Sequence, residues 1–180
     1  MLFCRSPLPE TYKSKLDRAV DFQSPSIDEV SWKIVEALQE NARISFSELG
    51  RQVGLTPPAV AERVRRLEDV GIIEGYRAVV NVQKLGLPLT AIIRFAARGR
   101  GSSETKHRLA AISEIIECYH VTGEDCFVLR IAVPSTEHLE GLLERLTDFG
   151  DTTTSIVLST PFAARVIEKE MVAAPRGLSD

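Results

Sequence analysis

The feature that most constrains the fold is a pair of short helices whose start and stop signals all lie within residues 45–71. The sequence "SFSE" is a capping box, in which Ser45 accepts a hydrogen bond from the backbone three residues on and Glu48 reaches back. Gly54 can end this first helix in the left-handed conformation, and Pro57 suits the first position of the second helix, where no N–H is needed. Two short capped helices joined by a tight turn that contains glycine predict a helix-turn-helix.

The segments on either side extend this motif into a domain. Upstream, "SIDE" is another capping box that begins at Ser26, and it is followed by apolar residues at helical spacing, namely Ile27, Val30, Ile34 and Leu38. Downstream, "IIEGYRAVVN" over residues 72–81 alternates enough to predict a strand pair, or short wing, that bends at Gly75. Together these segments predict a winged helix-turn-helix domain over residues 26–82.

The second helix of the motif has a buried face and an outward face. With about 100° of rotation per residue, Val60, Val64 and Leu67 form the buried stripe. In a helix-turn-helix the N-terminal half of this helix reaches base edges, and Arg65 and Arg66 suit a phosphate or a guanine. The candidate DNA contacts, which lie away from the stripe or on its flank, are Thr56, Pro58, Ala59, Glu62, Arg63, Arg65 and Arg66.

A solvated charged surface is the competing interpretation of these arginines. The helix is balanced in charge, because its three arginines stand beside three acids, Glu62, Glu68 and Asp69. The whole chain has a formal net charge of −3 and a pI of about 5.7, which argues against coating of nucleic acid by overall charge but allows a local basic surface. The capped helix before the motif, the glycine turn and the predicted wing favour DNA binding.

The residues after a linker at 82–88 follow a different pattern and form a second domain. Their apolar residues predict a strand over 89–98, a helix over 104–117 with Ile116 inward, a hairpin over 118–133, a helix over 135–150 closed by Gly150, and a strand over 152–160. This order is the βαββαβ of a ferredoxin-like sandwich, whose helices cover one face of an antiparallel sheet. We therefore predict an α+β chain with domains at 26–82 and 83–165, a flexible N-terminal extension over 1–25 and a C-terminal tail over 166–180.

Strand alternation divides the hairpin, which bends at Gly123, into two faces. The face suited to the two helices is predicted to hold Tyr119, Val121, Phe127, Leu129 and Ile131. The opposite face is predicted to hold Cys118, His120, Cys126, Val128 and Arg130, and no element of the chain is left to cover it. A mixed apolar and polar face of this kind predicts a partner subunit. Cys118 and Cys126 could lie across the hairpin from each other, and we expect both to be reduced in the cytoplasm.

Motifs of enzymes and metal sites are not found in the sequence. It has no P-loop, no G-x-G-x-x-G, no H-E-x-x-H and no Cys/His pair near a glycine-rich elbow, and its three cysteines lack the spacing of zinc ligands. We therefore expect no catalytic residues, no metal and no cofactor. No apolar run approaches the roughly 20 residues that span a bilayer, and the first residues lack the apolar core of a signal peptide, so we expect a cytoplasmic protein with no membrane partner.

Four stretches in a set order are typical of one protein family. They are "IDEVSWKIVEALQENARISFSELGRQVGLTPPAVAERVRRLEDVGIIEGYRAVVN", the core "ERVRRLEDVGII" within it, which leads to Gly75 and Tyr76, the hairpin "EIIECYHVTGEDCFVL" and the strand "TTTSIVLSTP". With them, the chain resembles the Lrp/AsnC family of bacterial and archaeal transcription regulators over most of its length. The resemblance implies an N-terminal DNA-binding domain, a C-terminal effector-binding RAM domain, and homodimers that often stack into tetramers or octamers. It also implies a small-molecule effector, usually an amino acid, near the contacts between dimers.

The hairpin turn is the candidate effector site. Its glycine lets backbone N–H groups approach an anion such as a carboxylate, and the resemblance places the effector nearby, at His120, Thr122, Gly123, Glu124, Asp125 and Cys126. Many members of the family have a second acid where this chain has Cys126. We predict a sequence-specific transcription regulator that responds to an amino acid. The alternatives are an amino-acid-sensing subunit of a metabolic enzyme and an architectural protein that compacts DNA.

Overall fold

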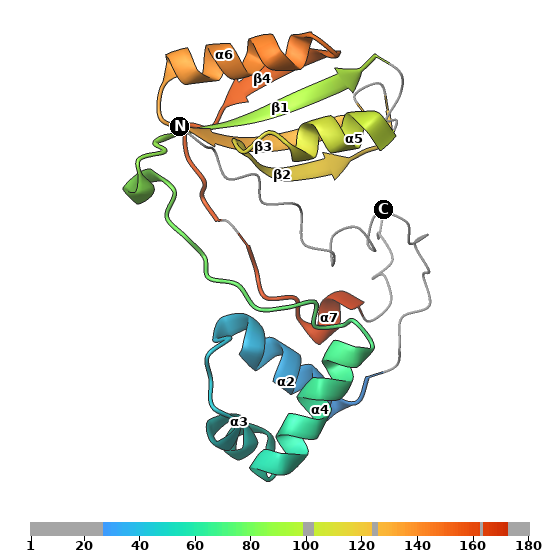
Figure 1. Cartoon of the computed structure of the whole chain (residues 1–180). Coiled ribbons are helices and arrows are strands. Elements are labelled where there is room, and N and C mark those ends of the chain that lie inside the picture. The colour runs from blue at the N-terminus through green and yellow to red at the C-terminus, as the bar shows by residue number, and fades with distance from the viewer. Residues whose placement is uncertain (1–26, 99–102, 124–125, 163, 173–180) are drawn as a thin grey trace, which may run out of the picture. The chain divides into compact units, whose positions relative to one another are not determined.

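The computed structural model describes residues 27–98, 103–123, 126–162 and 164–172, and these divide into two compact units (Figure 1). One unit contains residues 80–161, and the other contains residues 27–79 together with the described part of 162–172. The predicted N-terminal extension over 1–25 and the candidate effector residues Glu124 and Asp125 lie outside the described residues. The domain boundaries predicted from the sequence stay predictions, although the division between residues 79 and 80 falls close to the expected linker.

The first unit is a bundle of three helices, α2 (Glu29–Glu40), α3 (Phe46–Val53) and α4 (Pro57–Asp69). They enclose a core of buried side chains made up of Ile34, Leu38, Leu49, Val60, Val64 and Leu67. The last three are the stripe that the helical period predicts for α4, and that prediction is confirmed. The core therefore determines which face of α4 is left outward.

The predicted caps of α3 are confirmed, whereas the predicted N-cap of α2 is wrong. Ser45 accepts a hydrogen bond from the N–H of Glu48 at 3.1 Å, and Gly54 ends α3 with a φ of 73°, as predicted. Ser26, however, is not the N-cap of α2. The cap is Asp28, whose carboxylate accepts a hydrogen bond from the N–H of Ser31 at 2.8 Å. Both residue types are good caps, so the choice depends on where the helix starts.

A second glycine, which the sequence did not single out, sets the turn between α3 and α4. The N–H of Leu55 donates to the carbonyl oxygen of Gly50 at 2.9 Å. A Cβ on Gly50 would lie 2.5 Å from the carbonyl oxygen of Leu55, closer than a real side chain can approach. The turn therefore needs Gly50 for space and Gly54 for its left-handed backbone.

The predicted wing is wrong for this chain. Residues 72–81 are all described, and none of them is in a strand. The N–H groups of Ile72 and Ile73 bond back to the carbonyl of Leu67 at 2.9 and 3.1 Å, and both side chains pack against the helical core. The chain that follows is extended, and Val79 is 98% exposed. A strand needs hydrogen-bonded neighbours, and the described part of this unit supplies none.

The segment predicted to be a tail contains contacts with α2. Ile167 exchanges two hydrogen bonds with the side-chain amide of Gln39, one from its N–H to Oε1 at 2.8 Å and one from Nε2 to its carbonyl at 3.1 Å. Lys169, the first residue of the short helix α7 (Lys169–Val172), forms an ion pair with Glu29, and its N–H donates to Glu36 at 3.3 Å. Part of the segment is thus held on the helical unit.

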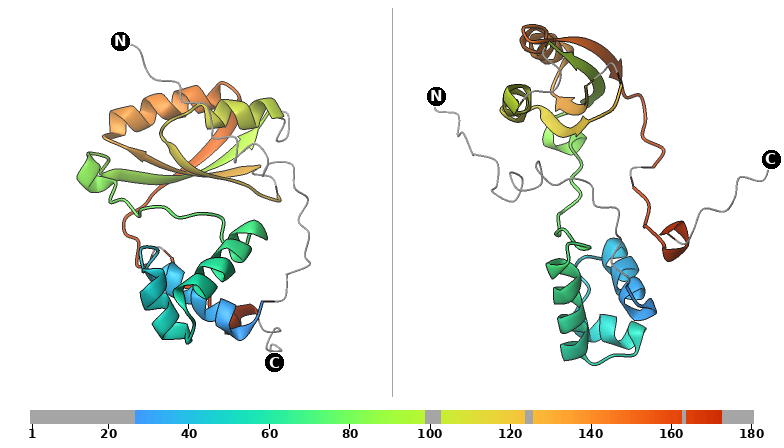
Figure 2. Two further views of the ribbon diagram at one scale, coloured as in Figure 1. Left: turned by 60° about the horizontal axis from the view of Figure 1, so that its bottom comes forward. Right: turned by 90° about the vertical axis from the view of Figure 1, so that its right-hand side faces the viewer.

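The second unit contains a four-stranded antiparallel sheet in the order β2-β3-β1-β4. Its strands are β1 (Leu89–Ala97), β2 (Ile115–His120), β3 (Phe127–Val133) and β4 (Gly150–Ile156), with a 3-10 turn at Gln83–Leu85 before the first. Helices α5 (Ser103–Ala110) and α6 (Thr136–Thr147) lie on the same side of the sheet, as the left view of Figure 2 shows. This is the predicted ferredoxin-like βαββαβ arrangement.

The core of this unit lies between the sheet and its two helices. The sheet contributes alternate residues of β1 and β3, and the helices contribute leucines, so that the buried set includes Ile93, Phe95, Phe127, Leu129, Ile131, Leu109, Leu142 and Leu146. Two predicted details are wrong. The first helix ends at Ala110 and Ile116 is 38% exposed, while Gly150 begins β4 and does not close α6. A Cβ on Gly150 would lie 2.2 Å from the ring of Phe95, so the glycine makes room for that ring.

Candidate DNA-binding and effector sites

The predicted DNA contacts lie together along the outward side of α4. Thr56 stands at the N-cap position, although its side chain makes no capping hydrogen bond. Ala59 and Arg63 are half-buried at the edge of the helical core, whereas the other predicted contacts, Thr56, Pro58, Glu62, Arg65 and Arg66, are exposed. These residues therefore lie on the surface of α4 or at the edge of its buried face, as the helical period predicts.

The three arginines of α4 differ in their ion-pair partners. Arg63 donates through one guanidinium nitrogen to both carboxylate oxygens of Asp28, at 2.6 and 2.8 Å, and to the hydroxyl of Ser31 at 3.0 Å. Arg65 pairs with Glu62 on the same helix at 3.2 Å. Arg66 has no ion-pair partner among the residues that the structure describes. Arg66 is consequently the cation of this helix that is available to a phosphate or a base.

The electrostatics of Asp28 reflect its partners. The hydrogen bond from Arg63 is the largest cause, and those from the side chain and backbone of Ser31 add to it, so that the pKa of Asp28 falls to about 2. Asp28 is thus ionised throughout the physiological range. Its carboxylate links the start of α2 to the middle of α4.

The N-terminus of α4 is a poor anion site by itself. Helices commonly bind phosphates through the free N–H groups of their first turn, but the first two residues of α4 are Pro57 and Pro58, which have none. Ala59 supplies an N–H, and that of Val60 already donates to Thr56 at 3.0 Å. An anion at this end of α4 would therefore be bound mainly by side chains and not by backbone N–H groups.

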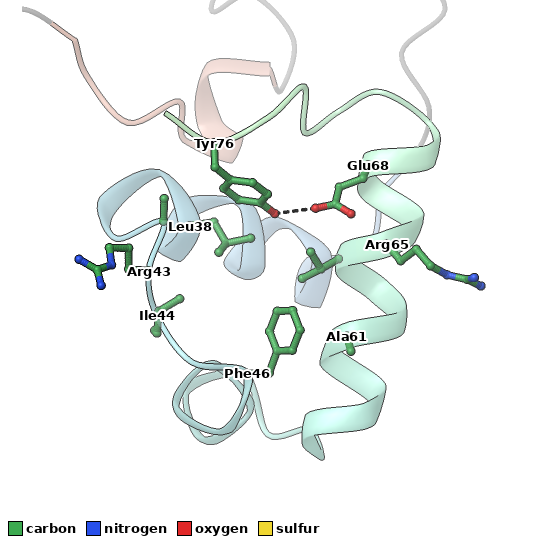
Figure 3. Close-up of a pocket in the computed structure, with 10 residues that line it drawn as sticks. Leu38, Arg43, Ile44, Phe46, Ala61, Arg65, Glu68 and Tyr76 are labelled. Carbon is green, nitrogen blue, oxygen red and sulfur yellow. Dashed lines mark hydrogen bonds between the residues drawn. The ribbon is translucent and has the colours of Figure 1, made fainter. Parts of the chain in front are cut away.

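A hollow of about 520 Å³ lies between the three helices and the chain after α4 (Figure 3). Its lining is mostly apolar and includes Leu38, Ile44 and Phe46. The hydroxyl of Tyr76 donates to Glu68 at 2.9 Å, and burial together with this carboxylate raises the pKa of Tyr76 to about 12. Arg43 and Arg65 also border the hollow, but their guanidinium groups point away from it. The hollow therefore offers no cation to bind the carboxylate of an amino acid.

The face assignment predicted for β2 is wrong because Cys118, Tyr119 and His120 pair across the hairpin in another register than the predicted one, and the strand also contains a β-bulge before them. Ile115 pairs with Ile131, but Glu117 pairs with Arg130, so two residues of β2 oppose one of β3 and the alternation reverses. After the bulge Tyr119 pairs with Val128 and lies on the face without helices, where it is 54% exposed. Cys118 and His120 pair with Leu129 and Phe127 on the helix-covered side instead. Glu117 was a sign in the sequence that the predicted faces were wrong. Strict alternation from Tyr119 places the charge of Glu117 on the predicted apolar face.

The described part of the hairpin turn is closed by short-range contacts. The N–H of Val121 donates to the carbonyl of Cys126 at 3.0 Å, and the ring of His120 lies 4.9 Å from that of Phe127, centroid to centroid. Gly123 has a φ of 115°, a conformation that favours glycine. Cys126 packs against the helix-side core, so it does not lie on the opposite face as predicted, and Cys118 faces Leu129 across the hairpin.

The comparison with known proteins identifies both units. An AsnC-type helix-turn-helix domain matches residues 27–68, and an Lrp/AsnC ligand binding domain matches residues 90–167. The chain is also 34% identical over 133 residues to the HTH-type transcriptional regulator LrpC of Bacillus subtilis, covering 74% of this chain and 92% of LrpC. The chain belongs to the Lrp/AsnC family.

Other members agree in sequence and in structure. The leucine-responsive regulatory protein of Haemophilus influenzae is 35% identical over 143 residues, which cover 76% of this chain and 86% of that protein. The structure of B. subtilis LrpC superposes with a TM-score of 0.73 at 32% identity, covering 78% of this chain and all of LrpC. A feast or famine regulatory protein from M. tuberculosis, solved in complex with L-methionine, has a TM-score of 0.73 at 34% identity, with coverage of 78% and 97%.

The family assignment defines the class of function. This Lrp/AsnC protein is a DNA-binding transcriptional regulator with a ligand-binding domain, and its relatives are regulators and not enzymes. Within the described part of the chain, no helix has the length and apolar character needed to cross a membrane.

Proposed function

We propose that this regulator binds its operator through the outward face of α4, as a homodimer that acts in the cytoplasm. The observation that carries the proposal is Arg66, an exposed arginine on α4 with no ion-pair partner among the described residues, one turn beyond Glu62. Thr56, Pro58, Ala59 and Arg65 complete the proposed contact face. A two-fold dimer would favour an inverted repeat whose half-sites are about 10 base pairs apart, or a multiple of that spacing.

The proposal is tested with a DNA duplex that the wild-type protein selects from a random-sequence pool. Arg66→Ala should weaken binding to this duplex by about 1–3 kcal/mol if Arg66 reads a base. Lys33→Ala is the matched control, because it removes the same charge from the exposed side of α2. Equal affinity of wild type and Arg66→Ala would refute the proposed face. Equal affinity of the wild type for selected and scrambled duplexes would instead support the architectural alternative.

The face of the sheet without helices is the proposed dimer surface. Helices α5 and α6 pack on the opposite side, through Leu109, Leu142 and Leu146. The uncovered face mixes apolar and charged groups, including Val128, Tyr119 and the ion pair of Arg130 with Glu117 at 2.5 Å. Such a mixture is typical of subunit interfaces. The expected partner is a second copy of the chain, as the family resemblance implies.

Light scattering on the full chain tests the dimer. Wild type should have the mass of a dimer or of a multiple of it, and masses of four or eight chains would mean that dimers stack. Val128→Lys should reduce the mass, because Val128 lies on this face and the lysine would bury an added charge at the contact between subunits. Lys106→Ala is the control, because it changes a charge on α5 and not on this sheet. A control on the sheet itself, such as Thr90→Lys, would not be suitable. A monomeric wild type would overturn the proposal.

We further propose that an amino acid is the effector and binds beside the hairpin turn. The support is the left-handed Gly123, the exposed Thr122 beside it and the L-methionine complex of the M. tuberculosis relative. Backbone N–H groups of the turn would take the carboxylate, and Glu124 or Asp125 would face the ammonium group. His120 and Cys126 would border the site. Binding there would change operator affinity by about 1–3 kcal/mol, and the coupling would be reciprocal.

Calorimetry with each common amino acid tests this site. Binding heat with at least one of them in the wild type, and its loss in Asp125→Ala, would support the site. No heat with any amino acid, or equal heat in both proteins, would mean that the effector site lies elsewhere or is absent. Cys126→Asp, which restores an acid common in the family, should not weaken binding.

A further inference from the structure

Arg63 and Asp28 join two helices that meet in the helix-turn-helix unit. Arg63 lies in the middle of α4, and Asp28 is the N-cap of α2, 35 residues earlier. The carboxylate accepts the guanidinium N–H groups on both oxygens, and Oδ1 also accepts the N–H of Ser31. The hydroxyl of Ser31, which is buried, accepts a third hydrogen bond from the same guanidinium nitrogen. The side chain of Arg63 is thereby held at the edge of the core.

Packing decides which face of α4 is buried, and the contact with Asp28 adds a directional restraint on its orientation. The apolar stripe of Val60, Val64 and Leu67 brings α4 against the other helices, but apolar contact is non-directional. A charge-assisted hydrogen bond is directional, and the one between Arg63 and Asp28 acts on the flank of α4 next to this stripe. It therefore resists rotation of α4 about its own axis. Such rotation would carry Arg66 and Thr56 away from the groove that they are proposed to read.

Exposure separates Arg63 from its neighbours. Its side chain is 34% exposed, compared with 68% for Arg65, whose partner Glu62 is a neighbour on the same helix. The Arg65 pair can open without moving any other element, because both residues are exposed and lie on α4. The Arg63 pair instead joins α4 to another element, because its partners belong to the start of α2. An arginine engaged in this way is poorly placed to act as a DNA contact.

We propose that Arg63 is a positioning residue which, through Asp28 and Ser31, sets the orientation of α4, and that it is not a DNA contact. The inference rests on the proposed binding of DNA through α4. It has a counter-intuitive consequence for Asp28. Loss of an acid from a DNA-binding domain should by charge alone strengthen binding to a polyanion. If Asp28 orients α4 through Arg63, its loss should weaken specific binding instead.

The test uses Asp28→Asn in the full chain, because asparagine is as good an N-cap as aspartate and only the charge is lost. We expect Asp28→Asn and Arg63→Gln each to reduce affinity for the selected duplex by about two- to fivefold, the range appropriate to a partly exposed ion pair. The double variant of Asp28→Asn and Arg63→Gln should have an affinity no lower than that of the single variant that binds less tightly. Glu48→Gln is the matched control, since it removes an acid whose partner, Arg51, is on the same helix. It should not reduce affinity.

Two readouts separate positioning from contact and from general stability. Binding to a scrambled duplex depends on charge and not on base reading, so the ratio of specific to non-specific affinity should fall in Asp28→Asn at a temperature where circular dichroism shows both proteins folded. The slope of log affinity against log salt should be unchanged in Arg63→Gln. A slope reduced by about 0.9 would show that Arg63 neutralises a phosphate and would overturn the inference.

Two further results would separate failure of this inference from failure of the proposed contact face. Equal or tighter binding by Asp28→Asn would overturn the inference while leaving the contact face of α4 intact. An unchanged affinity in Arg66→Ala would instead refute that contact face itself, whatever Asp28→Asn does.

Discussion

Helix α4 and the hairpin of β2 and β3 were both predicted to carry contacts, and their periodic patterns differ in how reliably they place side chains. On α4 the helical period assigned Val60, Val64 and Leu67 to the core, and all three are buried. On β2 the predicted faces of Tyr119 and of its neighbours Cys118 and His120 are exchanged, because the register across the turn differs from the predicted one. A bulge between Ile115 and Glu117 also puts the start of this strand out of phase with its end. The faces of α4, which begins at Pro57, do not depend on pairing with another element.

The difference has a physical basis. A strand has only two faces, so a shift of one residue in its pairing exchanges them completely. A helix spreads its side chains around an axis, and its backbone hydrogen bonds lie within the element. The hydrogen bonds of β2 go to another strand, so its register depends on contacts that are distant in sequence. Periodicity is therefore stronger evidence for α4 than for the hairpin.

The largest expected effect tests the faces of the hairpin. Leu129 is fully buried on β3, and Leu129→Ala should lower the free energy of unfolding by about 2–5 kcal/mol. Tyr119→Ala should cost much less within one chain, because Tyr119 lies on the face without helices. Urea denaturation at several protein concentrations would separate a loss of stability within the chain from a loss of stability through assembly. A concentration-independent loss of similar size for both variants would mean that Tyr119 lies on the helix-covered face, as the sequence predicted.

The next effect tests the turn that carries α4. Gly50→Ala should destabilise the helix-turn-helix unit by about 1–3 kcal/mol, because the new methyl group would meet the carbonyl oxygen of Leu55. Gly141→Ala is the matched control, since Gly141 lies inside α6 with open space around it. That control should stabilise its own unit by a few tenths of a kcal/mol to about 1 kcal/mol. A thermal melt in which both variants behave alike would show that the turn tolerates a side chain.

The smallest effect concerns the ion pair on α4 and its dependence on pH. The pKa of Asp28 is lowered to about 2 in the folded chain from an ordinary value of 3.8, so the pair stabilises the fold above pH 4 and loses this contribution as the pH falls towards 2. Because both partners are partly exposed, we expect less than about 1 kcal/mol. The difference in unfolding free energy between wild type and Asp28→Asn should therefore shrink between pH 4 and pH 2. A difference that is constant over this range would mean that the charge of Asp28 contributes nothing.

Much of the architecture followed from local sequence. The N-cap at Ser45, the left-handed Gly54 and the apolar stripe of α4 are all determined by residues within a few positions of one another. The order of strands and helices in the second unit, which defines the ferredoxin-like arrangement, could also be predicted, because each element has its own apolar pattern. The residues on the outward face of α4 could be named for the same reason.

Contacts between distant segments could not be predicted in this way. The partner of Arg63 lies 35 residues away, the contacts of Ile167 with Gln39 span 128 residues, and the bulge in β2 depends on its pairing with β3. The three arginines of α4 look alike in the sequence, yet one joins two helices, one pairs along its own helix and one has no ion-pair partner in the described part of the chain. Local patterns decide which face of an element is buried. The neighbours of a charged side chain depend on how the elements pack, because its long stem can reach several partners and the energy differences among them are small.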